Sequence, residues 1–142
     1  MSADQNKALV REYVDTWNRG DVEGLSHFWG PGMVHHNRNV KQSGDEVQRV
    51  ISNFMSAFPD LSFEIDDMFG ESDRVVTRMT AKGTHQGEFM GYAPTGKHFN
   101  CSLIGIARIA DGKFVEHWGI TDEIAIMAQI GALPEQYLQA MS

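Results

Sequence analysis

Residues 99–121, FNCSLIGIARIADGKFVEHWGIT, contain two apolar segments on either side of an Asp-Gly pair. Asp111 and Gly112 are typical of a two-residue hairpin turn, because both central residues of that turn adopt a positive φ. The pattern therefore predicts two long antiparallel strands, 99–110 and 113–121. The rest of the predicted fold is arranged around this hairpin.

Two more strands are predicted before the hairpin. Apolar and polar residues alternate in 61–66 and again in 75–82, with a turn at 70–73 between them. Together with the hairpin, these strands predict a four-stranded antiparallel meander. The connection at 83–97, GTHQGEFMGYAPTGK, contains four glycines and one proline. Connections of this length are typical of lids and binding loops.

Helices are predicted where apolar residues recur every three or four positions, with a short extended segment at 33–37 after a break at 30–32. The helical segments are 4–18, a short one from its cap Asp21 to Trp29, 44–58, 124–131 and 135–141. Helices on one face of a strongly bent antiparallel sheet give an α+β fold with a pocket on the concave side. We expect residues 1–142 to form one such domain.

Composition limits the classes of function. The chain has 142 residues, of which 42% are apolar, and a formal net charge of -7, which is unsuited to binding a nucleic acid backbone. Its single cysteine, Cys101, is expected to be a small buried apolar residue. The sequence has no signal peptide pattern and no run of eighteen apolar residues, so we expect a cytoplasmic protein that is not in a membrane.

Asp122 is the main candidate for acid/base chemistry, because a carboxylate between a strand end and an apolar segment could be buried beside a pocket. The alternative is that Asp122 only caps the following helix. Strand alternation puts Trp118 on the side of Asp122 and His117 on the opposite side. We therefore expect Trp118 in the pocket wall and His117 at a surface or an interface.

Four further polar side chains are candidates for supporting roles. His35 and His36 are adjacent in an extended segment, so only one of them can enter a pocket. Arg78 lies within a strand and His85 within the long loop, and either side chain could reach a ligand. No metal is expected, since the histidines and the cysteine lack the spacing of a metal site. Nucleotide-binding and serine hydrolase motifs are also absent from the sequence.

Several segments together carry a resemblance: WNRGD at 17–21, GTHQGEF at 83–89, APTGK at 93–97, HWGITD at 117–122 and QIG at 129–131. The chain resembles the SnoaL-like polyketide cyclases, within the superfamily of cone folds that includes ketosteroid isomerase and nuclear transport factor. The resemblance runs nearly end to end. The pattern GTHxGxFxGxxPTGK is specific to this group, whereas the first segment is shared more widely.

The resemblance implies a curved sheet wrapped around N-terminal helices, with a hydrophobic cavity, in a homodimer or higher homo-oligomer. Characterised cyclases of this family close a ring of an aromatic polyketide ester by intramolecular aldol condensation, without a metal or organic cofactor. An Asp at the position of Asp122 is their acid/base. This chain departs from those cyclases at Trp17, where they have Tyr, and near Ile51, where they have Asn. Some relatives are cofactor-independent hydroxylases.

We therefore expect an aldol-type cyclase with Asp122 as acid/base and His35 or His36, Arg78 and His85 as helpers. Its substrate would be small, mostly apolar and carbonyl-bearing. The residues expected to bind it are Tyr13, Trp17, Ile51, Phe54, Phe89, Met90, Phe99 and Trp118. Isomerase, hydratase or hydroxylase chemistry in the same pocket, and a non-catalytic ligand-binding or dimerisation module, remain open alternatives.

Overall fold

The computed structural model describes residues 2–37, 40–133, 136 and 139–140. Along the chain its elements are α1 (Ala3–Asn18), α2 (Val22–Ser26), β1 (Trp29–Asn37), β2 (Val40–Gln42), α3 (Gly44–Ala57), β3 (Ser62–Glu71), β4 (Arg74–Thr84), β5 (His98–Ala110), β6 (Lys113–Thr121) and α4 (Glu123–Gln129). The helix predicted at 135–141 falls mostly outside the described residues. None of the helices within the described ranges is long and apolar enough to cross a membrane.

The predicted hairpin forms the centre of the sheet. Asp111 and Gly112 adopt φ values of 52° and 73°, and β5 and β6 pair antiparallel on either side of them. The predicted meander of β3, β4, β5 and β6 is confirmed by the pairing of neighbouring strands. The part of the chain from β3 to β6 therefore supplies an antiparallel layer of four strands.

Two strands at the other edge differ from the sequence prediction. The sheet has six strands in the order β2-β1-β6-β5-β4-β3, and β1 pairs with β6 in parallel. The segment predicted as a short extension at 33–37 is the end of a longer strand that begins at Trp29. A shift in register between Trp29 and Val34 admits Pro31, which has no N–H to donate to a neighbouring strand. The sequence pattern did not indicate the first part of this strand, because glycine and proline at 30–32 are typical of turns.

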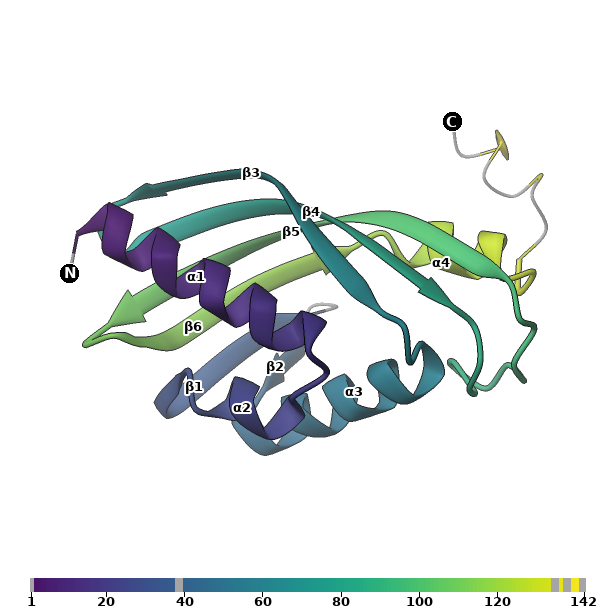
Figure 1. The fold of residues 1–142 in the computed structure, drawn as a ribbon, viewed down its shortest axis with the longest axis horizontal. Helices are drawn as coiled ribbons and strands as arrows, with labels where there is room; N and C mark the ends of the chain where they lie inside the picture. Colours follow the sequence, from purple (N-terminus) through teal and green to yellow (C-terminus); the bar gives the residue numbers. More distant parts are fainter. Residues whose placement is uncertain (1, 38–39, 134–135, 137–138, 141–142) are drawn as a thin grey trace.

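Helices α1, α2 and α3 lie on one side of the curved sheet, and α4 lies at the end of β5 (Figure 1). Helix α1 lies across the concave face, α3 lies beside β1 and β2, and α2 contacts both α1 and α3. Helices α1 and α3 each begin with a capping box, Ser2 with Gln5 and Ser43 with Glu46, which satisfies exposed N–H groups of the first turn. The α+β architecture with a curved sheet around N-terminal helices is confirmed.

The second helix is shorter than predicted. It ends at Ser26, because the chain turns there and the carbonyl of Phe28 accepts a hydrogen bond from Phe114 N at 2.8 Å. This bond places Trp29 at the start of β1, beside the last strand of the hairpin.

The long connection at 85–97 packs against the end of α3. His85 N donates to the carbonyl of Lys97 at 2.9 Å, and Gly96 N donates to the carbonyl of His85 at 2.8 Å. Gln86 N and Gly87 N both donate to the carbonyl of Ala57, at 3.0 and 3.1 Å. The connection is therefore tied to the body of the protein at several points.

Replacing Gly87 with Ala should destabilise the fold, because the added Cβ would collide with the backbone carbonyl of Ser56, which cannot move away as a side chain can. We expect the free energy of unfolding in urea to fall by about 1–3 kcal/mol. The neighbouring exposed residue supplies a matched control, Glu88→Ala, which should stay within about 0.5 kcal/mol of the wild type. Equal stability of the two variants would contradict this packing.

Candidate functional site

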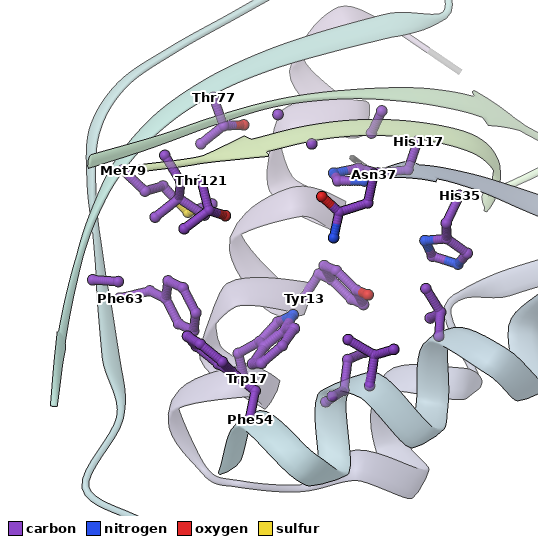
Figure 2. Close-up of a pocket in the computed structure, with 18 of the residues that line it drawn as sticks. Tyr13, Trp17, His35, Asn37, Phe54, Phe63, Thr77, Met79, His117 and Thr121 are labelled. Atoms are coloured by element: carbon purple, nitrogen blue, oxygen red, sulfur yellow. The ribbon is translucent and has the colours of Figure 1, made fainter. Parts of the chain in front are cut away.

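A cavity of about 210 Å³ lies between the concave face of the sheet and helices α1 and α3 (Figure 2). Its walls are mostly apolar, with aromatic side chains from the helices facing the strands. An apolar cavity of roughly 150 Å³ is large enough to bind benzene. The volume of the cavity therefore suits a small organic ligand or one end of a larger one.

The apolar wall agrees in part with the residues expected to bind substrate. Those that line the cavity are Tyr13, Trp17, Ile51, Phe54 and Phe89. Three others do not line it. Phe99 is buried in the core, with its ring centroid 4.6 Å from that of Phe58. Met90 is 53% exposed on the long connection, and Trp118 lies on the outer face of the sheet.

The pairing of β1 with β6 decides which histidines face the cavity. His35 is in register with His117, and partners in a parallel pair point to the same face of the sheet. Both side chains line the cavity, and their ring centroids are 6.0 Å apart. The prediction that His117 lies at a surface or an interface is therefore wrong.

His36 and Trp118 form the corresponding pair on the outer face. Their rings stack with centroids 5.1 Å apart and planes 4° apart, and His36 Nε2 lies 2.7 Å from Glu116 Oε2. The Arg74 guanidinium lies 5.2 Å from the centroid of the Trp118 ring. The ring of His36 is thus turned away from His35, although His36 is among the residues around the cavity. The expectation that Trp118 forms the pocket wall is wrong.

Burial keeps the two inward-facing imidazoles neutral. It lowers the pKa of His117 to about 4, with a smaller contribution from the charge of His36. Burial likewise lowers the pKa of His35 to about 3, with further contributions from His117 and His36. No hydrogen bond joins a ring nitrogen of His117 to another of the described residues. His117 can therefore accept a proton from a ligand or donate one to it.

Tyr13 faces the strands from α1 (Figure 2). Its hydroxyl oxygen accepts a hydrogen bond from Trp29 Nε1 at 3.1 Å. Burial raises the pKa of Tyr13 to about 12, so the hydroxyl keeps its proton at neutral pH. Since Trp29 occupies a lone pair of the oxygen, the O–H remains available as a donor.

Other polar groups line the cavity that the sequence pattern did not indicate: Asn37, Gln42, Thr77, Thr121 and Glu123. All except Glu123 lie on strands. Their inward direction follows from the register of the sheet, which requires knowing that β1 and β6 are partners. The alternation within each strand separated two faces correctly, but did not say which face is inside.

Asp122 is exposed and is not among the residues that line the cavity. It is the N-cap of α4, with Oδ1 accepting a hydrogen bond from Ala125 N at 3.1 Å. Its neighbours Thr121 and Glu123 do line the cavity. The capping role is therefore present, whereas the expected burial of Asp122 in the pocket is not.

Arg78 and His85 also lie outside the cavity lining. Arg78 is on the outer face, where its Nη2 lies 2.6 Å from Asp67 Oδ2. His85 is fully buried beside Phe58, and its Nδ1 lies 3.0 Å from Thr95 Oγ1. This contact holds the long connection together. No group of three or more His, Cys, Asp or Glu side chains suited to a metal ion occurs in the part of the chain that the structure describes.

Lowering the pH should destabilise the protein through the two cavity histidines. An unfolded histidine takes up a proton near pH 6.5, whereas folded His117 does so only near pH 4. Between these pH values the unfolded state therefore binds more protons than the folded state. The contribution of His117 to the free energy of unfolding is fully present above pH 6.5 and is lost as the pH falls towards 4. Each such histidine contributes up to about 1.4 kcal/mol per pH unit to the slope of the free energy of unfolding against pH.

Denaturant unfolding at several pH values measures this slope. His117→Gln should reduce this slope by up to about 1.4 kcal/mol per pH unit, the contribution of one proton, because glutamine does not titrate. His27→Gln, which removes an exposed imidazole, is the control and should change the slope less than His117→Gln does. Equal slopes in the wild type and the His117→Gln variant would show that His117 is not held neutral by burial.

The sequence and fold match known proteins over nearly the whole chain. AcmA of Streptomyces galilaeus, an aklanonic acid methyl ester cyclase, is 28% identical over 131 residues, which cover 87% of this chain and 89% of AcmA. AclR of the same organism, a proposed hydroxylase, superposes with a TM-score of 0.89 at 38% identity, covering 94% of this chain and all of AclR.

A third relative has a solved structure. IdmH of Streptomyces antibioticus, a proposed polyketide cyclase, superposes with a TM-score of 0.80 at 31% identity, covering 89% of this chain and 99% of IdmH. The sequence model of the SnoaL-like polyketide cyclases matches residues 7–130, which include both cavity histidines and Tyr13. This chain belongs to the SnoaL-like polyketide cyclase family.

Proposed function

We propose that this protein catalyses acid/base chemistry on a small, mostly apolar carbonyl compound, without a cofactor, and that the reaction is an intramolecular aldol ring closure. The observation that carries this proposal is the neutral imidazole of His117, which faces an apolar cavity and has no partner among the described residues. A cyclase among the sequence relatives supports it.

The first step is removal of a proton from a carbon next to a carbonyl. His117 accepts this proton and becomes an imidazolium, while the electron pair moves onto the carbonyl oxygen as an enolate. The hydroxyl of Tyr13 and the side-chain amide of Asn37 are the donors available to that oxygen. Burial opposes a charged imidazolium on its own, but the enolate beside it compensates with the opposite charge.

Ring closure follows within the same substrate. The enolate carbon attacks a second carbonyl carbon, a carbon–carbon bond forms, and the second carbonyl oxygen becomes an alkoxide. The imidazolium of His117 returns its proton to this alkoxide, which restores the neutral enzyme. The aromatic side chains of Trp17, Phe54 and Phe63 would hold the flat part of the substrate against the strands.

Asp122 is the alternative base that the family resemblance implies. It lies at the edge of the site, between two residues that line the cavity, and its side chain is exposed. Two substitutions separate the candidates. His117→Gln removes the imidazole, and Asp122→Asn removes the charge while keeping an N-cap, since Asn caps helices as well as Asp does.

Exchange of the acidic C–H proton for deuterium tests the first step directly. With an aromatic β-keto ester that cannot cyclise, NMR in D₂O should show exchange catalysed by the wild type. General acid/base groups contribute roughly 10²- to 10⁴-fold, so His117→Gln should lower the rate by at least 100-fold. Asp122→Asn should stay within about 3-fold, because its side chain does not line the cavity.

The opposite result, loss in Asp122→Asn with exchange retained in His117→Gln, would assign the base to Asp122. Circular dichroism of both variants controls for folding. No exchange by the wild type across a panel of keto esters would overturn the proposed chemistry and favour a ligand-binding role. Product analysis with substrates that can cyclise then tests ring closure itself.

Hydroxylation is a second candidate, favoured by the 38% identity to AclR, a proposed hydroxylase. It would begin with the same carbanion, which adds to dioxygen to form a hydroperoxide; a two-electron reductant, such as a thiol, would then cleave the O–O bond to give the alcohol and water. Mass spectrometry distinguishes the two reactions, because hydroxylation adds an oxygen atom to the carbon skeleton. An aldol product keeps the composition of the substrate until water is lost.

We also propose that two copies associate through the outer face of the sheet. Ile104 and Ile120 are partners in register on β5 and β6, and they are 49% and 79% exposed. Adjacent exposed apolar side chains in the middle of a sheet are typical of a protein interface. Arg78 with Asp67, and Arg108 with Glu116, place both signs of charge on this face.

Ile120→Asp should weaken this association, because the carboxylate would be buried against a second copy. Light scattering after size exclusion should show a shift from dimer to monomer. Val40→Asp, at a residue that is 53% exposed on β2, is the control and should not change the mass. A wild-type protein that is monomeric at all concentrations would contradict the interface.

A further inference from the structure

Gly105 and Gly119 face each other in the middle of the cavity wall. They are direct partners in the antiparallel pairing of β5 with β6. Asn37 pairs with Gly119 on one side, and Thr77 pairs with Gly105 on the other. These four residues form one row across four strands, and all of them line the cavity. Two polar side chains therefore flank a stretch of wall that has no side chains.

The backbone does not explain why these positions are glycine. Neither residue adopts a positive φ, so any other residue could adopt the same extended conformation. A glycine in the interior of a strand weakens the strand and often marks a place where another group approaches closely. The relevant property of Gly105 and Gly119 is therefore that they have no Cβ, which leaves space above the backbone.

The group that occupies the space is the imidazole of His117. A Cβ at Gly105 would lie 2.9 Å from His117 Nε2, and a Cβ at Gly119 would lie 3.1 Å from His117 Cε1. His117 belongs to the neighbouring row, in register with His35, so its ring leans from that row over the glycine pair. Figure 2 shows the ring beside Asn37.

We propose that Gly105 and Gly119 are positioning residues that let the His117 imidazole lie across the sheet, between Asn37 and Thr77, where its nitrogens meet the substrate. This inference rests on the proposed function for its catalytic meaning, but the placement itself does not. A methyl group at either glycine would push the ring off the sheet towards Tyr13. Misplacement of a catalytic group by about 1 Å can cost 10²-fold in rate.

A structural role is the competing explanation, since glycines in strands also allow a sheet to bend. The two explanations differ in how the glycines couple to His117. If the glycines leave space for the imidazole, the loss of stability caused by an added methyl group should depend on the presence of His117. If the glycines allow the sheet to bend, the loss of stability should be the same whether or not the imidazole is present.

A double-mutant cycle separates these cases: wild type, Gly105→Ala, His117→Ala and the double variant. Gly105→Ala should fold, because the atom nearest to the new methyl group is the end of a side chain that can rotate. We expect Gly105→Ala to lower the unfolding temperature of the wild type, but not that of His117→Ala. Equal losses in both backgrounds would overturn the proposal.

NMR supplies a readout that a merely structural role would not move. In Gly105→Ala, the Cε1–H resonance of His117 should shift and its titration midpoint should rise, since the ring has left the wall that desolvates it. The resonance of the exposed His27 is the internal control and should not change. An unchanged His117 resonance in a folded variant would also overturn the proposal.

Turnover links the placement to catalysis. In the deuterium exchange assay, Gly105→Ala should lower kcat at least 10-fold while KM stays within about 3-fold, as expected when alignment is lost and binding is kept. If the wild type has no exchange activity, the proposed function fails. The double-mutant cycle and the His117 resonance would then still decide whether the glycines position the imidazole.

Discussion

The site depends on the parallel pairing of β1 with β6. This pairing joins the N-terminal part of the chain to the last strand of the meander and places His35 beside His117. It also aligns the inner faces of the two strands, because His35 and His117 lie on the same face of the sheet and both line the cavity. A slip of one residue would exchange His35 for His36 and bring a residue paired with Glu116 into the apolar cavity.

The two faces of these strands provide different environments for the same type of side chain. On the outer face, His36 contacts Glu116 and stacks on Trp118. Inside, His35 and His117 lie against the apolar cavity, where burial disfavours the charged imidazolium and lowers their pKa values to about 3 and 4. A neutral imidazole in an apolar cavity is suited to exchanging protons with an uncharged substrate.

The cavity combines this polar strip with an aromatic wall from the helices. Tyr13 contributes to both, since its ring packs edge-on against Phe114 and its hydroxyl is held by Trp29. The relatives show that the same fold carries proteins named as a cyclase and as a proposed hydroxylase. Proton removal beside a carbonyl would serve both reactions, so small changes in the walls could direct one carbanion to different partners.

The sequence by itself determined the local elements of this protein: the Asp111–Gly112 hairpin, the alternating strands before it and the amphipathic helices. These features follow from short-range rules of periodicity and turn geometry, which a single sequence displays. The family motifs, matched within residues 7–130, added the cone fold and its cavity.

Only the tertiary structure decided which residues face the cavity. Alternation put His117 and Trp118 on opposite faces, but the inner face is chosen by contacts between β1 and β6, which are far apart in the sequence. For Asp122 the sequence left a buried base and a helix cap open; the strand ends at Thr121 as predicted, and the exposed carboxylate caps α4. Long-range register depends on packing of the whole chain, and no local pattern encodes it.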